Sequence, residues 1–220
     1  MTTASGGGPG EEYYQQNYRS YDLQNAPHKL AYYRAQIEQH RDRAQPRCLY
    51  DIGCGPGNFL QSLGTGWEVY GSDINTFAME RAASRMPAGH FALGAGAVTK
   101  LFDRRFPVVT AFDVLEHVPE IEMAGAQIAE QLTPGGLFLF VVPVYDGLSG
   151  PVIKLLDKDP THVHKRERAF WIDWASRHFS VLEWQGLLRY LLPGGYYMHV
   201  VTRSARGHVP AICVACRARG

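Results

Sequence analysis

The chain has 220 residues, a formal net charge of +1 and an ordinary globular composition, with 45% hydrophobic and 20% charged residues. This length fits one substantial domain. The near-zero charge gives no electrostatic reason to expect nucleic acid or an anionic membrane surface as a partner. The longest apolar run, 137–144, is far shorter than the roughly 20 residues of a membrane span, and the chain opens without a secretory signal. We therefore expect a cytoplasmic protein, monomeric or homodimeric, that binds neither nucleic acid nor membranes.

The four cysteines are too few and too oddly spaced for a disulfide scaffold, which favours a reducing compartment. Cys213 and Cys216 form a C-x-x-C pair within an apolar segment that resembles a strand. No second ligand pair accompanies them, so we interpret them as buried strand residues and not as zinc ligands.

The first part of the chain differs in composition from the rest. Residues 1–10 are glycine-rich and are predicted to be disordered. Residues 11–46 are predicted to form a helical lid, with a helix over 27–44. The remainder, 47–220, is predicted to be one domain of alternating strands and helices. Its strands are expected at 48–52, 67–72, 90–93, 108–112 and 137–142, with helices between them at 58–63, 75–86 and 119–132.

Apolar strands separated by amphipathic helices predict an α/β protein whose parallel sheet is covered on both faces. After the fifth strand the pattern changes. We expect a long loop over 146–164, a helix over 165–177 and strands over 179–188 and 209–217. Insertions at about 144–165 and 189–208 interrupt this last part of the domain.

A glycine loop follows the first predicted strand, in the sequence Asp51-Ile52-Gly53-Cys54-Gly55-Pro56-Gly57. Such a strand–loop–helix unit places backbone N–H groups at the carboxyl edge of an open α/β sheet, where ligands bind. In the dinucleotide fingerprint the third glycine would stand at position 58, which is Asn here. The Asp51 carboxylate would also repel a pyrophosphate. The loop therefore favours a cationic nucleoside over NAD or FAD.

Asp73 closes the second predicted strand. A carboxylate at this strand end can accept hydrogen bonds from both hydroxyls of a ribose. The alternative is that Asp73 caps the helix that follows it.

Four segments resemble motifs of the class I S-adenosylmethionine-dependent methyltransferases, in the expected order. They are Leu49–Leu60, Val69–Ile74, Val109–Pro119 and Leu132–Leu139. The third is similar to small-molecule members such as the ubiquinone-type O-methyltransferases. The resemblance implies a Rossmann-like three-layer sandwich with a seven-stranded, mostly parallel sheet and an antiparallel last strand. It also implies methyl transfer, expected to be O-methylation, from S-adenosylmethionine to a small-molecule acceptor.

The resemblance further implies which residues hold the cofactor. Many family members have an acidic residue after the third strand that receives the adenine amino group, where this chain has Ala95. We expect backbone and apolar groups to take its place. The implied cofactor-binding residues are Asp51, Gly53, Gly55, Gly57, Asp73, Ile74, Gly96, Ala97, Asp113 and Leu115.

Catalytic candidates follow the fourth and fifth strands. Glu116 and His117 resemble a pair common in small-molecule methyltransferases, where a histidine can take the acceptor's proton. Alternatively, Glu116 braces the next helix and His117 only lines the pocket. The segment 157–164 resembles an acceptor-side loop, which makes His162 a second candidate base and His164 a candidate acceptor contact.

A metal site is the alternative for this loop, because the two histidines of an extended H-x-H segment lie on one face. No third ligand other than Asp159 is evident, and we expect no metal.

Tyrosines are the remaining candidates for acceptor contacts: Tyr14, Tyr18 and Tyr21 from the lid, and Tyr196 from the second insertion. The alternative is that the first three pack the lid onto the sheet and that Tyr196 mediates dimerisation. Two other functions stay open. One is a non-catalytic protein that binds S-adenosylmethionine as a partner or regulatory subunit, and the other is a nucleotide-dependent oxidoreductase.

Overall fold

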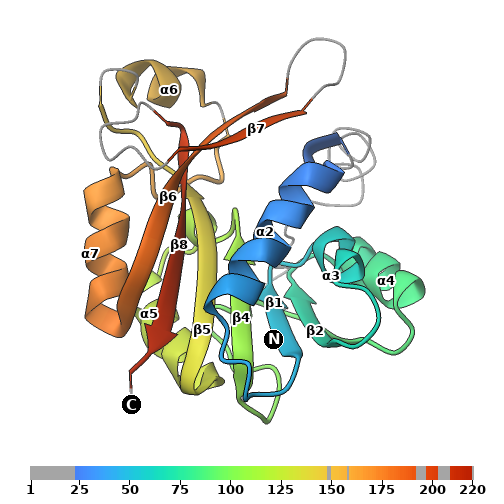
Figure 1. The fold of residues 1–220 in the computed structure, drawn as a ribbon. Helices are drawn as coiled ribbons and strands as arrows, with labels where there is room; N and C mark the ends of the chain where they lie inside the picture. Colours follow the sequence, from blue (N-terminus) through green and yellow to red (C-terminus); the bar gives the residue numbers. More distant parts are fainter. Residues whose placement is uncertain (1–22, 148–149, 158, 192–196, 203–208, 220) are drawn as a thin grey trace, which may run out of the picture.

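The computed structural model describes residues 23–147, 150–157, 159–191, 197–202 and 209–219. Figure 1 shows one central sheet with helices on both sides. The elements are α2 (Pro27–His40), β1 (Cys48–Ile52), α3 (Asn58–Ser62), β2 (Glu68–Asp73), α4 (Thr76–Arg85), β3 (His90–Leu93), β4 (Phe106–Phe112), the short 3₁₀ helix η1 (Leu115–His117), α5 (Ile121–Gln131), β5 (Leu132–Pro143), α6 (Gly150–Leu156), α7 (Arg168–His178), β6 (Phe179–Leu191), β7 (Tyr197–Thr202) and β8 (Ala211–Ala218).

The sheet has the strand order β3-β2-β1-β4-β5-β8-β6-β7. Strands β1 to β5 are parallel to one another, and β8 runs antiparallel to both β5 and β6. The mostly parallel sheet with an antiparallel last strand is therefore confirmed.

The predicted number of strands was wrong, because the sheet has eight and not seven. The extra strand, β7, lies inside the segment that we expected to be an insertion. It pairs antiparallel with Gly186–Leu191 of β6. Its sequence, Tyr-Met-His-Val-Val-Thr, is rich in the β-branched and aromatic residues that favour strands.

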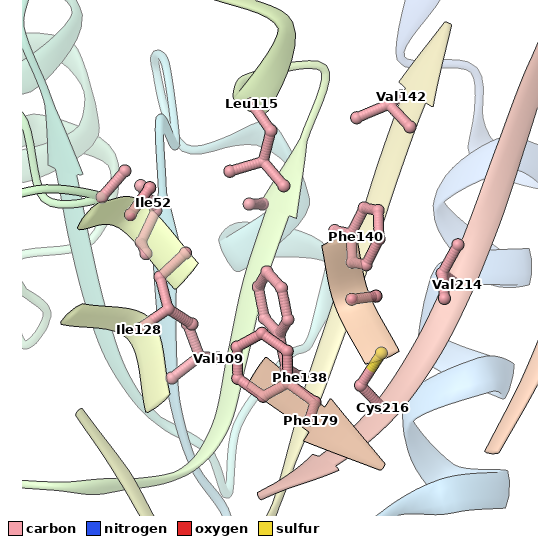
Figure 2. Close-up of a cluster of buried hydrophobic side chains, with 14 of the residues drawn as sticks. Ile52, Val109, Leu115, Ile128, Phe138, Phe140, Val142, Phe179, Val214 and Cys216 are labelled. Carbon is pink, nitrogen blue, oxygen red and sulfur yellow. The ribbon is translucent and has the colours of Figure 1, made fainter. Parts of the chain in front are cut away.

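The two faces of the sheet are covered by different helices, as the alternation along β5 shows. Phe138, Phe140 and Val142 belong to the cluster that includes residues of α5 and α7 (Figure 2). Leu137 and Leu139 belong to the cluster that includes residues of α2, α3 and α4. All five side chains are fully buried. This arrangement confirms the three-layer sandwich.

Two helices differ from the sequence-based prediction. Helix α2 ends at His40 and not at residue 44, because Arg41 adopts an extended conformation. Helix α6 lies within 146–164, which we expected to be a loop. Among the described residues, no helix combines the length and the apolarity needed to cross a bilayer.

Cys213 and Cys216 lie in β8 and pack into the two opposite core clusters. Residues three apart in a strand point to opposite faces, so the two thiols cannot share a metal ion. Both are buried and free.

Candidate active site

A cavity of about 480 Å³ lies at the carboxyl ends of β1, β2 and β4. The chain order reverses between β1 and β4, which is where open α/β sheets bind ligands. The volume is within the range of small-molecule sites. Of the residues predicted from the sequence to bind the cofactor or to act in catalysis, those that line the cavity are Asp51, Gly53, Gly55, Asp73, Ile74, Gly96, Ala97, Asp113 and His117.

The glycine loop has backbone angles that residues with a side chain rarely adopt. Gly53, Gly55 and Gly57 have φ values of 69°, 52° and 80°, in the left-handed region that glycine adopts readily. A Cβ at Gly53 would also lie 2.3 Å from a methyl group of Val114. Gly57 contributes through the backbone as the N-cap of α3 and is not part of the cavity wall.

Asp73 fastens the glycine loop to the end of β2. Its carboxylate accepts hydrogen bonds from the backbone N–H of Gly55 (3.0 Å) and of Asn75 (2.9 Å). The N-cap of α4 is Asn75, whose side chain accepts a hydrogen bond from the N–H of Ala78. Asp73 is therefore not the helix cap that the sequence left open. Burial raises the pKa of this carboxyl, while the backbone N–H groups oppose the shift.

Asp51 is more deeply buried, with 3% of its surface exposed. Thr110 donates a hydrogen bond to one carboxylate oxygen at 2.6 Å. Burial is the main cause that raises the pKa of Asp51 to about 7, with a further contribution from the charge of Asp73. No cation among the described residues lowers it. A cationic ligand would stabilise the ionised form.

Gly96 has no room for a side chain. A Cβ there would lie 1.9 Å from the Tyr50 hydroxyl and 2.4 Å from the Ser72 hydroxyl, which hydrogen-bond to each other at 2.6 Å. This contact explains why a glycine precedes Ala97 in the cavity wall.

Gly96→Ala is expected to lower the free energy of unfolding by about 1–3 kcal/mol, because it overpacks this contact. Gly64→Ala is the comparison. Gly64 has φ 74° and open space around its Cβ position, so only the left-handed backbone costs energy there, about 1–2 kcal/mol. Urea unfolding of both variants measures the two costs. A Gly96→Ala protein as stable as wild type would contradict the packing argument.

Asp113 combines an unusual backbone with a buried ion pair. It is the one non-glycine residue with positive φ (58°) in the described part of the chain. Both carboxylate oxygens accept hydrogen bonds from Arg189 of β6, at 2.7 and 2.5 Å. Burial by itself would raise the pKa of Asp113, but the guanidinium outweighs it and holds the pKa below its usual value. The sequence did not predict a role for Arg189, because this residue stands at the start of the segment 189–208 that we expected to be an insertion.

Helix α2 contributes Lys29 and Tyr33 to the cavity wall, and neither was predicted from the sequence. Lys29 is 6% exposed, and its ammonium lies 5.8 Å from the ring of Tyr33 and 5.3 Å from that of Tyr197. Tyr33 stacks on Phe112 of β4, with ring centroids 4.1 Å apart. The sequence does contain an indication of this position. Lys29 stands four residues before Tyr33 and therefore lies on the same, otherwise apolar face of the helix.

His117 is held in one tautomer by Thr161. Its Nδ1 lies 3.1 Å from the Thr161 carbonyl oxygen and 2.9 Å from the Thr161 hydroxyl, which itself donates to Asp159 at 2.6 Å. Both Thr161 oxygens are therefore acceptors, which assigns the proton to Nδ1 and a lone pair to Nε2. Burial lowers the pKa of His117, so the ring is neutral at neutral pH.

His162 lies beside His117, with ring centroids 4.7 Å apart, but it does not line the cavity. Its Nδ1 is 2.7 Å from the carboxylate of Asp157, which also accepts a hydrogen bond from Tyr145. The Asp157 carboxylate lies 3.3 Å from the ammonium of Lys165. Burial by itself would raise the pKa of Asp157, but its hydrogen bonds with Tyr145, with His162 and with the backbone N–H of Asp159 hold the pKa below its usual value.

Glu116 lies behind the two histidines. It is 1% exposed, and its Oε2 has no hydrogen-bond partner among the described residues. Burial, with the charge of Asp113, raises the pKa of Glu116 well above its usual value. Glu116, His117 and His162 each offer one ligand atom within 4.8 Å of the other two, and this donor set is one that could hold a divalent ion.

Other predicted residues lie elsewhere. His164, a candidate acceptor contact, lies outside the cavity wall and approaches the Val118 carbonyl with Nε2 at 2.8 Å. Leu115 is fully buried in the core beneath the cavity. The four candidate acceptor contacts, Tyr14, Tyr18, Tyr21 and Tyr196, lie outside the described residues.

Comparison with known proteins identifies the family. Residues 16–205 match the model of a family described as a methyltransferase domain. The chain belongs to this methyltransferase family. Trans-aconitate 2-methyltransferase of Methylobacterium radiotolerans is 31% identical to it over 155 residues, which are 69% of the chain and 55% of the relative. Ubiquinone biosynthesis O-methyltransferase of Burkholderia multivorans is 34% identical over 112 residues, 48% of each protein. The chain spans about half the length of the curated relatives it matches.

The chain also shares its fold with solved structures. Magnesium protoporphyrin IX methyltransferase from Synechocystis, which contains bound SAH, superposes with a TM-score of 0.65 over 95% of this chain and 97% of its own, at 15% identity.

S-adenosylmethionine is the cofactor that membership of this family indicates for the chain. The residues present fit such a group. Asp51 is a buried carboxyl without a cationic partner in the described part of the chain, and the cofactor carries an ammonium. The glycine loop leaves its backbone uncovered by side chains, and the Asp73 carboxylate lies at the adjoining strand end.

Proposed function

We propose that this chain transfers the methyl group of S-adenosylmethionine to an oxygen atom of a small-molecule acceptor. The observation that carries the proposal is that one cavity joins the Asp51 and Asp73 carboxyls to the neutral ring of His117. When bound, the cofactor supplies a methyl group on a sulfonium that leaves as a thioether. The names of the two relatives support a small acceptor, and one of them names O-methylation.

The cofactor-binding roles follow from charge and from free lone pairs. We assign the Asp51 carboxylate to the cofactor's ammonium. We assign Asp73 to the ribose hydroxyls, because a carboxylate has about four acceptor sites and the hydrogen bonds from the Gly55 and Asn75 N–H groups leave others open. The adenine ring is assigned to the backbone and apolar surface around Gly96 and Ala97, since Ala95 offers no acceptor side chain.

At the other end of the cavity, His117 is assigned as the base that accepts the acceptor's hydroxyl proton on Nε2. Thr161 and Asp159 keep the other nitrogen protonated and so hold the ring in this tautomer. The His162–Asp157 pair lies behind His117 and is assigned a supporting part, in which it fixes the loop that carries Thr161. The chain's main contribution would be to hold the acceptor oxygen in line with the methyl group.

Asp51→Asn is expected to weaken S-adenosylmethionine binding by about 10-fold or more near pH 8, because one charge-assisted contact contributes about 1.5–3 kcal/mol. Wild-type binding is expected to weaken as the pH falls below about 7, where Asp51 becomes protonated in the free protein. Calorimetric titrations across this pH range measure both effects. A wild-type dissociation constant that does not change with pH would contradict the assignment.

The same variant has an opposite effect on stability. The pKa of Asp51 is raised from 3.8 to about 7, so between these values the native state binds more protons than the unfolded state. Stability without cofactor therefore falls as the pH rises through this window. Asp51→Asn removes that loss and is expected to stabilise the free protein near pH 8. Asp103→Asn, at a fully exposed carboxylate, is the control for both experiments.

The direct test is mass spectrometry of a metabolite extract incubated with the protein and methyl-labelled cofactor. A labelled ether or ester supports the proposal. Binding of S-adenosylmethionine without any labelled product would favour the non-catalytic partner, and binding of NAD(H) in its place would favour the oxidoreductase. The four free cysteines support a reducing compartment such as the cytoplasm as the place of action.

A further inference from the structure

Lys29 is a cation in the cavity wall whose ammonium forms no ion pair with a carboxylate of the described residues. It lies on α2, it is 6% exposed, and the contacts of its ammonium are the ring faces of Tyr33 and Tyr197. An isolated charge in such a place costs free energy unless a ligand compensates it. The position of Lys29 in the wall of a ligand cavity therefore indicates that the ligand carries a negative charge.

The charged groups around Lys29 do not neutralise it. Asp113 is the nearby carboxylate, but both of its oxygens bind the guanidinium of Arg189, so these two charges cancel each other. His199 of β7 faces Tyr33, with ring centroids 6.1 Å apart, and burial with the nearby cations lowers its pKa to about 4. His199 is therefore neutral, and the cluster has a net charge of about +1.

A second group in the cavity wall also lacks a partner. The Tyr33 hydroxyl is buried and has no hydrogen-bond partner among the described residues. Tyr33 lies one helical turn after Lys29, so the two side chains share one face of α2. The ammonium and the phenol are both hydrogen-bond donors, and a carboxylate can accept from both.

We propose that the methyl acceptor is an organic anion whose carboxylate group binds the Lys29 ammonium and the Tyr33 hydroxyl. This inference rests on the proposed function and narrows it to one chemical class of acceptor. The carboxylate anchors the molecule on the α2 side of the cavity. The acceptor oxygen is then presented between this anchor and His117, which lines the same cavity.

The test uses Lys29→Met, which keeps an unbranched side chain one heavy atom shorter and removes its charge. A metabolite extract is divided by anion exchange into a retained anionic pool and an unretained pool, and each is incubated with methyl-labelled cofactor. We expect labelled product from the anionic pool. Once its acceptor has been purified, we expect Lys29→Met to raise KM by about 10- to 100-fold, with the cofactor dissociation constant unchanged. Lys100→Met, at an exposed lysine, is the matched control.

Thermal unfolding without ligand distinguishes a role of Lys29 in acceptor binding from a role in stability. Because Lys29 is buried without a counterion in the described part of the chain, Lys29→Met is expected to leave the melting temperature equal to or above that of wild type. A lower melting temperature together with an unchanged KM would overturn the proposal. So would labelled product from the unretained pool alone, which would leave the proposed methyl transfer intact.

If neither pool gives product, the proposed function fails, and ligand binding decides the inference by itself. Thermal shifts with salicylate against salicylamide, and with succinate against succinamide, are then measured in the presence of S-adenosylhomocysteine. Stabilisation by either carboxylate that exceeds that of its amide, and that disappears in Lys29→Met, supports the anion site. Equal shifts with the acids and the amides would overturn it.

Discussion

Replacing His117 with glutamine is expected to lower kcat by about 10²–10⁴-fold, the usual contribution of a positioned base. Glutamine keeps the size and polarity of the side chain but cannot accept the proton at neutral pH. The cofactor dissociation constant should stay close to that of wild type, since the residues assigned to the cofactor are Asp51, Asp73 and the glycine loop. Steady-state kinetics together with calorimetry separate the two quantities.

The pH profile gives this experiment a second measurement. Burial lowers the pKa of His117 below its ordinary 6.5, so the ring is a free base at neutral pH. Wild-type kcat should therefore be flat around pH 7 and fall only as the pH drops through the lowered pKa. His117→Gln should lose this acid limb. His90→Gln, at an exposed histidine of β3, is the control. A wild-type rate and profile in His117→Gln would show that His117 is not the base.

Asp73→Ala is expected to weaken binding of S-adenosylhomocysteine by about 100-fold. Two effects add. The proposed charge-assisted contacts to the ribose are lost, at about 1.5–3 kcal/mol each, and the Gly55 N–H loses the carboxylate that fastens the loop. Calorimetry measures the affinity, and circular dichroism verifies that the variant is folded. Asp103→Ala is the control, since that carboxylate is exposed and pairs with Lys100. An affinity equal to wild type in Asp73→Ala would remove Asp73 from the ribose site.

The cavity-lining residues that the sequence predicted each stand next to a strand that the sequence also predicts. The glycine loop and Asp73 each follow a strand whose apolar pattern predicts its end, and parallel strands bring their carboxyl ends to one edge. For this reason the sequence places Asp51, Gly53, Gly55 and Asp73 together. The family resemblance and the three-layer fold rested on the same segments.

The part that the sequence did not predict depends on contacts between distant segments. Arg189 reaches Asp113 across 76 positions, because β6 continues past the sheet's end into a hairpin with β7. Lys29 reaches the cavity because α2 packs across the sheet. The position of His162 beside His117 depends on how the loop after α6 folds back onto η1. Periodicity along the chain contains no information about such contacts.

The order of the strands places the glycine loop and the hairpin of β6 and β7 in different parts of the sheet. Strands β1 to β3 lie on one side of the point where the chain reverses, and β4 to β8 lie on the other. The hairpin of β6 and β7 forms the far edge of the sheet, and it meets the cavity region through Arg189 (Figure 1). Mutations that lengthen or reshape this hairpin would leave the glycine loop and its strands intact. Substitutions confined to this hairpin can therefore alter the Asp113 side of the cavity while the glycine loop and Asp73 stay in place.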